Sequence, residues 1–566
     1  MSEGPHLTRR ALLGGLAGAG AAGLLRRPGA AIAAAPPAGE PGVFSEWVGT
    51  VAGRSREIVV ARPFTMAGVQ WEAPRSARIE LRARSLGGRW SRWGVASTLG
   101  HGPDRPASEA LIGEPVWTGA ADVAEVRSSQ PLAGVRLHFV DVGAAAPGAA
   151  TARAATAGAA TAAAAPMAQP VLHAGPGQPP IIARAGWAGR GSLPAVVPGY
   201  GEVKMAFVHH TDSLNGYGRA EVPAIIQGMY VFHRFVRGWD DVGYNFLIDL
   251  YGRIWEARQG GIDEAVVGAQ AGGYNLQSTG VGMIGTFTGV VPSSVALASL
   301  QRLIAWKLSL HGVPAVGHVT VVVNPADYFY TPFRPGQHVS LPRVAGHRDG
   351  CTTDCPGNAF YARLPMLRPR IKALAGPVAR IELFAPAEPG SASAPVAVPG
   401  RLTDLGGAPI AGAPVEVQRF SATVHGASTT TIATATTGAD GSFTAMVALT
   451  QLTLLRALHR AAPAAVSTLV SVEVAPAITV SIASTVPLTV TGTVDPPTKK
   501  ATIELFTVQP DGHWQSLSSK QVPVRHGAFT ATLTTPGPGA YGLSVHTPAD
   551  AVSAAGASAP VLVTVT

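Results

Sequence analysis

Alternation of apolar and polar positions predicts β-strands in the first quarter of the chain. The segments RIELRAR (Arg78–Arg84) and VRLHFVDV (Val135–Val142) place apolar side chains at every second position, which is typical of strands with one buried face. Glycine-rich turns and the tryptophans of WSRW lie between them. We therefore predict an N-terminal β-domain over residues 40–142, laid out as a small β-sandwich. The Ala-, Thr- and Pro-rich residues 143–178 predict a flexible linker.

A mixed pattern follows over residues 179–376. Strand-like runs such as MAFVHH, YNFLIDL and GVGMIGTF alternate with two segments of helical periodicity. In the first segment apolar residues recur at helical spacing over 222–236, and Gly238 can end the helix. In the second, the serine pair 293–294 can cap a helix that Gly312 closes. This alternation predicts a mixed α/β domain, a β-sheet with packed helices.

After residue 376 the helical patterns largely stop. VEVQ (Val415–Gln418) and TGADGSFTA (Thr437–Ala445) predict a strand, an Asp-Gly turn and another strand. A turn–Gly–x–Phe–Thr–Ala pattern occurs in both GSFTAMVAL and GAFTATLTT. We predict two loosely repeat-like β-sandwich modules, over 377–476 and 477–566. The segment LTLLRALHRAA in the first module is compatible with a strand pair or a short helix.

The N-terminus carries the features of an export signal. Arg9 and Arg10 precede a weakly apolar, glycine-rich run that is shorter than the roughly 20 residues of a membrane span. Small residues that suit signal cleavage follow it, and the Thr-Arg-Arg-x-Leu-Leu pattern resembles a twin-arginine signal. We predict a signal peptide over residues 1–35 and no later transmembrane segment. The mature protein is expected to be secreted, or located in the cell wall or periplasm.

Composition and charge narrow the choice of partners. The 566-residue chain has 43 Lys and Arg against 34 Asp and Glu, a formal net charge of +9. Because the excess is spread out and forms no basic run, it argues against nucleic-acid binding and favours mild attraction to polyanionic cell-wall polymers. The high counts of Gly (67) and Pro (47) favour β-rich modules and linkers over long helices. We expect a monomer.

The densest candidate chemistry lies in GHRDGCTTDCPG (Gly346–Gly357), which holds the only two cysteines of the chain. His347 and Cys355 offer an imidazole nitrogen and a thiolate, a donor set that suits Zn²⁺. A third ligand is expected from FVHHT, at the end of an apolar strand. Only one of His209 and His210 can face the site, because strand side chains alternate. Three protein ligands would leave a fourth position for water, as in catalytic zinc sites.

Two alternatives compete with this site. Cys351 and Cys355 are close enough in sequence to form a disulfide, which an exported protein could keep. A different trio, His347, Cys351 and Cys355, would share one face of a helix. Gly350 and the Thr-Thr-Asp run argue against a helix there.

Several motifs together resemble the amidase-2 family, which comprises bacteriophage-type N-acetylmuramoyl-L-alanine amidases and peptidoglycan recognition proteins. ARAGW, FVHHT, GWDDVGYNFLID, a helix, GHRD and TDCPG occur in the order and spacing of that family, over about residues 179–370. The resemblance implies a central zinc amidase domain whose metal ligands are His209, His347 and Cys355. It also implies that Tyr244 is the catalytic tyrosine.

The resemblance implies a secreted, zinc-dependent enzyme that hydrolyses the amide between N-acetylmuramic acid and L-alanine in peptidoglycan. Tyr244 would donate a hydrogen bond to the oxyanion or orient the water. Thr353 would share that task, at a position that holds Lys in the phage-type enzymes and Thr in many recognition proteins. Members with Ser in place of the ligand Cys only bind, so Cys355 favours catalysis. The alternative is a non-catalytic peptidoglycan receptor or wall-associated binding protein. Gln270, where members commonly have His, and Thr286, where Asn or Asp is usual, leave the substrate details open.

Other residues have weaker interpretations. His210 is expected to be a core-facing histidine or one that orients a ligand, and Tyr244 could instead be a plain core aromatic. The remaining candidates are expected to be surface or packed histidines, tryptophans that stack on sugar or fill the core, and an asparagine that lines the peptide groove: His233, His311, His318, Trp239, Trp255 and Asn275.

Overall fold

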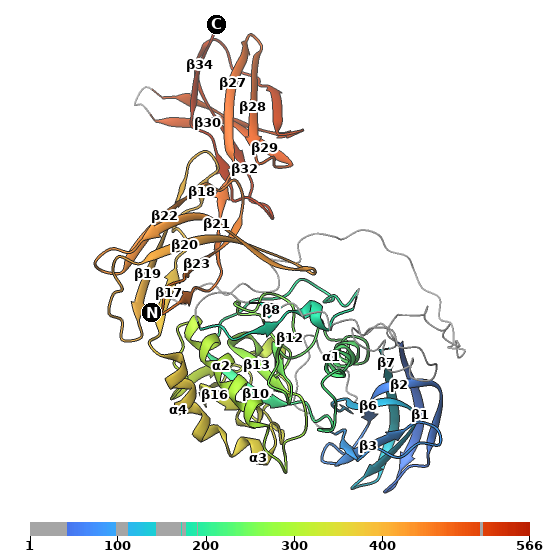
Figure 1. Ribbon diagram of the computed structural model, residues 1–566. Coiled ribbons are helices and arrows are strands. Elements are labelled where there is room, and N and C mark those ends of the chain that lie inside the picture. Colours follow the sequence, from blue (N-terminus) through green and yellow to red (C-terminus); the bar gives the residue numbers. More distant parts are fainter. Residues whose placement is uncertain (1–41, 98–110, 143–170, 173–176, 190, 510–512) are drawn as a thin grey trace, which may run out of the picture.

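The computed structural model describes residues 42–97, 111–142, 171–172, 177–189, 191–509 and 513–566 (Figure 1). The predicted signal peptide and nearly all of the predicted linker lie outside these residues. The described elements form an N-terminal sheet, a central sheet with helices, and two pairs of C-terminal sheets. Within these ranges, no helix combines the length and the apolar character that crossing a membrane requires.

The N-terminal region is one antiparallel sheet of seven strands in the order β1-β7-β2-β6-β3-β4, with β5 paired to β2. Its strands are β1 (Gly42–Val51), β2 (Ile58–Trp71), β3 (Ile79–Arg84), β4 (Gly94–Val95), β5 (Leu111–Ile112), β6 (Val116–Ser128) and β7 (Leu132–Asp141). The alternate residues of β3 are buried in the core of this sheet, as their pattern predicts. All seven strands are hydrogen-bonded into one sheet, whereas a sandwich would have two separate sheets. The pairing of β2 with β6 shifts register twice along its length.

The central sheet has the order β16-β10-β13-β11-β12-β9-β8. Its strands are β8 (Val171–Leu172), β9 (Ile181–Ile182), β10 (Met205–His210), β11 (Phe246–Ile248), β12 (Ile254–Glu256), β13 (Ser278–Met283) and β16 (Val344–Gly346). The strands β16, β10, β13 and β11 run parallel and are buried along their whole length. Strands of this kind are covered on both faces. The antiparallel pair of β14 (His318–Val322) and β15 (His338–Pro342) shares an apolar cluster with β10 of the central sheet.

Helices cover both faces of the central sheet (Figure 1). On one face lie α2 (Ser294–Leu310) and α4 (Leu364–Ala375), which share a core with alternate strand residues. On the other face lies α1 (Val222–Val231), continued by a π-helical turn (Phe232–Val236). The short helical segments are Arg184–Gly186, Asn275–Gln277, Pro325–Asp327, His347–Asp349 and α3 (Asn358–Tyr361).

The two predicted helices are confirmed, with their ends where the sequence places them. Ser293 caps α2 by accepting the backbone N–H of Ala296 at 3.2 Å. Gly312 follows α2 with a φ of 68°, and Gly238 follows the π-turn with a φ of 70°, a backbone region that glycine adopts without strain. The helix α4 was not predicted, because its prolines and charged residues obscure a narrow apolar stripe.

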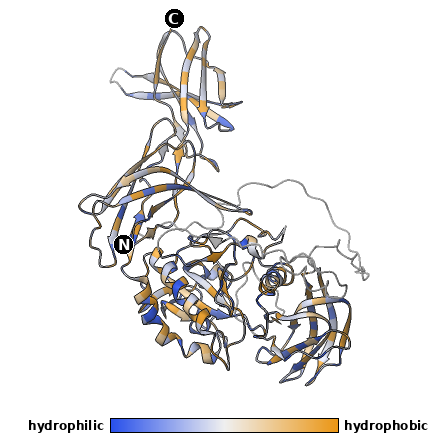
Figure 2. Cartoon of the chain, in the orientation of Figure 1, coloured by the Kyte–Doolittle hydropathy of each residue, from blue (hydrophilic) through white to orange (hydrophobic). Residues whose placement is uncertain are grey.

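Each C-terminal pair of sheets encloses its own core, as in a β-sandwich. The first pair has the orders β17-β19-β22 and β21-β20-β23-β24, and the second has β27-β28-β31 and β30-β29-β32-β33. Alternating hydropathy along these strands is visible in Figure 2. The first-pair strands are β17 (Ala379–Leu383), β18 (Gly390–Ser391), β19 (Val396–Asp404), β20 (Pro414–Thr423), β21 (Gly426–Thr436), β22 (Ser442–Val447), β23 (Thr453–His459), β24 (Ala465–Val466), β25 (Val470–Val472) and β26 (Val474–Ala475). The second-pair strands are β27 (Ala477–Thr485), β28 (Leu488–Asp495), β29 (Lys500–Val508), β30 (Trp514–Pro523), β31 (Ala528–Thr532), β32 (Gly539–Thr547), β33 (Gly556–Ala557) and β34 (Val561–Val565).

In the first C-terminal pair of sheets, the structure decides one open alternative and corrects one prediction. LTLLRALHRAA forms strand β23 rather than a helix. The Asp440–Gly441 turn joins β21 to β22, which belong to different sheets, so it is not the turn of a hairpin. The boundaries at 376 and 476 stay predictions.

Candidate metal centre

Two candidate ligands lie at the carboxyl ends of neighbouring parallel strands. His209 is near the end of β10, and His347 directly follows β16, which pairs with β10 in parallel. Side chains at this edge of a parallel sheet converge, which makes it a common place for sites. Cys355 returns to the same edge on a loop, where the backbone N–H of Arg348 donates to the Cys355 carbonyl at 3.0 Å.

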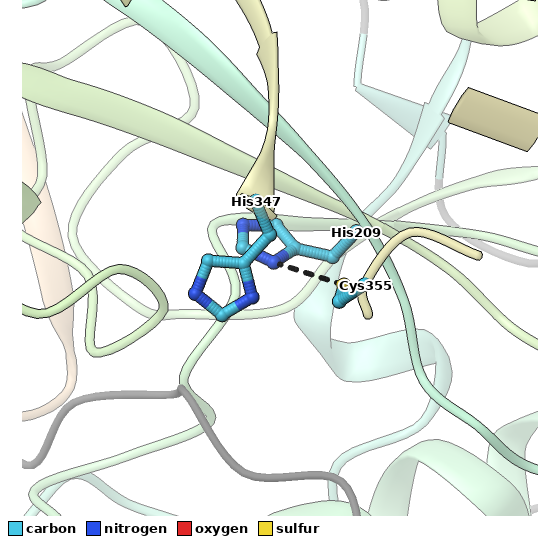
Figure 3. Close-up of side chains that lie close together, drawn as sticks. All are labelled: His209, His347 and Cys355. Atoms are coloured by element: carbon cyan, nitrogen blue, oxygen red, sulfur yellow. Dashed lines mark hydrogen bonds between the residues drawn. The ribbon is translucent and has the colours of Figure 1, made fainter. Parts of the chain in front are cut away.

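The structure brings His209, His347 and Cys355 together (Figure 3). One ligand atom from each lies within 4.8 Å of the others. The Nδ1 of His209 is 3.7 Å from the Sγ of Cys355, and the two imidazole rings are 4.5 Å apart. All three side chains are fully buried. Two nitrogens and one sulfur facing one another form a donor set suited to zinc.

Cys351 takes no part in this cluster. Its thiol is buried in a separate apolar cluster with Phe207 and Tyr274, and both cysteines are free. The alternative of a Cys351–Cys355 disulfide is therefore wrong. The helical trio is also wrong, because the turn at His347 is a single 3₁₀ turn that does not continue to Cys355.

The neighbouring histidine orients the thiol without facing it. The ring of His210 points to the opposite face of β10, where its Nδ1 accepts the backbone N–H of Phe287 at 3.2 Å. Its own backbone N–H donates to the Sγ of Cys355 at 3.4 Å. A hydrogen bond of this kind stabilises a thiolate. Burial is the main cause that raises the pKa of Cys355 well above its usual value, and the carboxylates of Asp212 and Glu114 add to the rise. A bound metal cation would remove the thiol proton.

Gln270 fixes the orientation of His209. Its Oε1 lies 2.5 Å from the Nε2 of His209. Because an amide oxygen only accepts, Nε2 carries the ring proton, and Nδ1 is left to face Cys355. The amide nitrogen of Gln270 donates to the Ser278 hydroxyl at 2.9 Å. From the sequence, Gln270 was expected to affect substrate recognition. Its contacts show instead that it holds the candidate metal ligand His209.

Asn275 also supports the site from within. Its Oδ1 accepts the backbone N–H groups of Gln270 and Ala271, at 2.9 and 3.0 Å. The residue is 2% exposed, so the expectation that it lines a peptide groove is wrong.

Two glycines on β13 leave room beside His209. In the parallel register, Gly282 lies opposite His209 and Gly280 opposite Phe207. A Cβ on Gly280 would be 2.4 Å from the Gln270 side chain, and one on Gly282 would be 3.2 Å from the Tyr244 ring. The two glycines of the GVG motif therefore leave the space over the sheet that the side chains of Gln270 and Tyr244 occupy.

Tyr244 lies beside the cluster, just before β11. Its ring is 5.5 Å from that of His209, and the side chain is 1% exposed. Burial raises its pKa well above its usual value, and the nearby carboxylate of Glu114 adds to the effect. The phenol is thus a neutral hydrogen-bond donor. Thr353 accepts the backbone N–H of Cys355 at 3.2 Å, so it shapes the ligand loop.

The remaining candidates are mostly packed. Trp239 and Trp255 are 3% and 0% exposed and fill the core rather than offer faces to sugar. His318 is exposed, and burial lowers the pKa of His311 well below its usual value. His233 is fully buried beside Glu114. No sequence pattern pointed to Glu114, which comes from the N-terminal domain.

Two segments match known families. Residues 199–358 match the family described as N-acetylmuramoyl-L-alanine amidase. Residues 28–167 match the family described as Rv3811 N-terminal galactose-binding domain-like.

Curated relatives resemble only part of the chain. Over 184 residues, the chain is 34% identical to peptidoglycan-recognition protein LE of Drosophila melanogaster. The aligned segment covers 32% of this chain and 45% of that protein. Over 138 residues it is 30% identical to N-acetylmuramoyl-L-alanine amidase of Mus musculus, covering 24% of this chain and 21% of that protein. The chain thus spans less than half the length of these two relatives.

Solved structures resemble the same part. One is peptidoglycan recognition protein-LE in complex with tracheal cytotoxin, a monomeric diaminopimelic acid-type peptidoglycan. The identity is 28% and the TM-score 0.26, over 33% of this chain and 92% of that chain.

Proposed function

We propose, on the premise that residues 199–358 form a domain of the N-acetylmuramoyl-L-alanine amidase family, that this protein is a zinc-dependent amidase of peptidoglycan. The bond cut would be the amide between the lactyl group of N-acetylmuramic acid and L-alanine. The observation that carries the proposal is the buried cluster of His209, His347 and Cys355 beside Tyr244. Relatives named as recognition proteins and one named as an amidase both match, so the residues of the site carry the argument.

The ligand set fits a catalytic zinc. His209 would bind through Nδ1, and His347 and Cys355 would complete three protein ligands, which leaves one tetrahedral position open. When bound, zinc would polarise the scissile carbonyl and lower the pKa of a bound water to about 7. Gln270 and the His210 backbone would hold two of the ligands in place, a role typical of groups behind a metal site.

Tyr244 would act on the scissile carbonyl. As the C=O bond lengthens and charge builds on its oxygen, the phenol would donate a hydrogen bond to it. Burial keeps the pKa of Tyr244 high, so the hydroxyl keeps its proton at neutral pH. Thr353 is the proposed second donor, since its hydroxyl can still donate while it accepts the N–H of Cys355.

The decisive experiment digests purified peptidoglycan with the mature, zinc-loaded protein. New alanine amines and new reducing sugar ends are measured, with and without a chelator. We expect amines without reducing ends, and a loss of at least about 100-fold on chelation or in Cys355→Ala. The matched control is Cys351→Ala, which removes the other buried cysteine and is expected to keep its activity.

A receptor would behave differently. If the zinc-loaded protein binds the polymer but releases no alanine amine, the amidase proposal fails and peptidoglycan recognition takes its place. Reducing ends appearing with the amines would point to a glycosidase contaminant or a different bond.

The setting of the enzyme is proposed from the sequence. Residues 1–35 would direct export, and the mature monomer would act at the cell wall or in the periplasm. N-terminal sequencing of the protein recovered outside the cytoplasm tests this, because cleavage near residue 35 is expected.

A further inference from the structure

A buried carboxylate of the N-terminal domain reaches the amidase domain. Glu114 lies between β5 and β6 and is 2% exposed. Its Oε1 accepts a hydrogen bond from the Nη2 of Arg237 at 2.8 Å, and its Oε2 lies 3.5 Å from the Nε2 of His233. His233 lies within the π-turn, and Arg237 directly follows it. A buried charge of this kind needs such partners to persist.

The contact is embedded in an apolar interface. Met66 and Val140 of the N-terminal strands belong to the same core cluster as the apolar residues of α1. The ring of Phe232 lies against the backbone of Gly68, where a Cβ would be 2.3 Å from its Cζ. Domains joined by a continuous apolar core do not move freely against each other. Glu114 is therefore held at a fixed place.

His233 connects Glu114 to the backbone next to Tyr244. Its Nδ1 accepts the backbone N–H of Gly243 at 3.2 Å, so the ring proton sits on Nε2, the nitrogen that faces Glu114. Gly243 directly precedes Tyr244. The Tyr244 ring lies 6.2 Å from the ring of His233 and 5.5 Å from that of His209.

We infer that Glu114 is a positioning residue for the amidase site: it orients His233, which holds the Gly243 amide and thereby the place of Tyr244. The inference rests on the proposed function. The Glu114 carboxylate also raises the pKa of Tyr244, with an effect second only to burial, which agrees with their closeness. The N-terminal domain then contributes a residue that positions the proposed catalytic tyrosine.

A double-mutant cycle tests whether Glu114 acts through Tyr244. Glu114→Gln keeps the size of the side chain and removes its charge. We expect kcat to fall about 10-fold, because small misplacements of a catalytic group are costly, with KM and zinc content unchanged. In a Tyr244→Phe background the same change is expected to add little. An equal fold-loss in both backgrounds would mean a merely structural role and would overturn the inference.

Hydrogen exchange provides a readout that needs no activity. The amide of Gly243 is expected to exchange faster in Glu114→Gln and in Glu114→Ala than in the wild type. The matched control is Arg75→Ala, which removes a different contact between the same domains, the Arg75 guanidinium over the Tyr330 ring at 4.6 Å. It is expected to leave both kcat and this exchange unchanged.

The outcomes separate the two proposals. Wild-type kcat and exchange in Glu114→Gln would overturn the inference and leave the amidase intact. A wild-type protein that releases no alanine amine would overturn the amidase, while the exchange measurement still decides whether Glu114 holds the Gly243 backbone.

Discussion

At the scale of single residues, the candidate metal centre depends on groups that never touch the metal. Gln270 holds the Nε2 of His209 at 2.5 Å and is itself held by Ser278. Removing the oxygen lets the imidazole turn and lets the wrong tautomer compete. We therefore expect the affinity for zinc to depend on a residue outside the proposed ligand set.

This dependence can be measured with Gln270→Leu, which keeps the volume and removes the acceptor. We expect zinc affinity to fall about 10- to 100-fold, measured by competition with a chromophoric chelator. Ser278→Ala is the matched control: it leaves the oxygen of Gln270 in place, and a smaller loss is expected. Unchanged affinity in Gln270→Leu would show that the His209 ring is held by other contacts.

A second residue-scale prediction concerns acid stability. Burial, with a contribution from Arg136, lowers the pKa of His138 to about 4 from an ordinary 6.5. As the pH falls, His138 therefore takes up its proton first in the unfolded chain. The contribution of neutral His138 to the free energy of unfolding is complete above pH 6.5 and is lost as the pH falls through 4. The loss should be about 2 kcal/mol, allowing for partial exposure of the ring. Urea titrations from pH 4 to 8 should show a flatter profile in His138→Gln; parallel profiles would contradict this.

At the scale of elements, α1 is packed from two sides. The central sheet covers one face, and the N-terminal strands cover the other, where Phe232 of the following π-turn packs on Gly68. Such a helix is apolar around most of its circumference, as its buried residues show. It has no room for added atoms on the side of the N-terminal domain.

Gly68→Ala is therefore expected to destabilise the protein by about 1–3 kcal/mol, since the new methyl group overpacks the interface. Calorimetry of the first unfolding transition gives the measurement. Gly289→Ala is the control, because a Cβ there meets nothing within 4 Å, and a change within about 0.5 kcal/mol is expected. Equal effects at the two glycines would mean that α1 is not tightly seated.

The sequence predicted elements better than contacts. Periodicity located α1 and α2, and strand alternation left His209 and His210 as alternatives until the family motifs favoured the first. The helix α4 escaped because Pro369 lies inside it. The roles of Gln270 and Glu114 were not predicted for another reason. Their hydrogen-bond partners lie 61 and 119 residues away in the sequence, and no local sequence pattern indicates a contact over that separation.

At the scale of the whole molecule, a buried ionic contact ties the first C-terminal module to the central domain. Arg456 of β23 contacts the carboxylates of Asp263, at 2.8 Å, and Glu264. The amine of Lys307 donates to the backbone carbonyls of Ile262 and Glu264. Burial raises the pKa of Glu264 to about 7, and Arg456 opposes that rise.

Arg456→Met would leave Glu264 buried without its main counter-charge, which costs about 3 kcal/mol. Because the pKa of Glu264 is raised in the folded state, the variant should lose further stability as the pH rises through 7. Calorimetry at pH 6 and pH 8 provides the measurement. Arg460→Met is the control, since it removes an exposed ion pair with Glu416 inside the module, for which about 1 kcal/mol or less is expected. If both variants behave alike, the module is tied to the central domain by other contacts.

The shared core around α1 also has a consequence for the order of synthesis. The N-terminal strands leave the ribosome well before α1 and can close their own core at once. The face formed by Met66, Trp117 and Val140 stays bare until α1 has been made. At about 5–20 residues per second the delay is on the order of several seconds. For that time the nascent chain presents a folded domain with an apolar face, a natural target for chaperones and a point where stalled translation would invite aggregation.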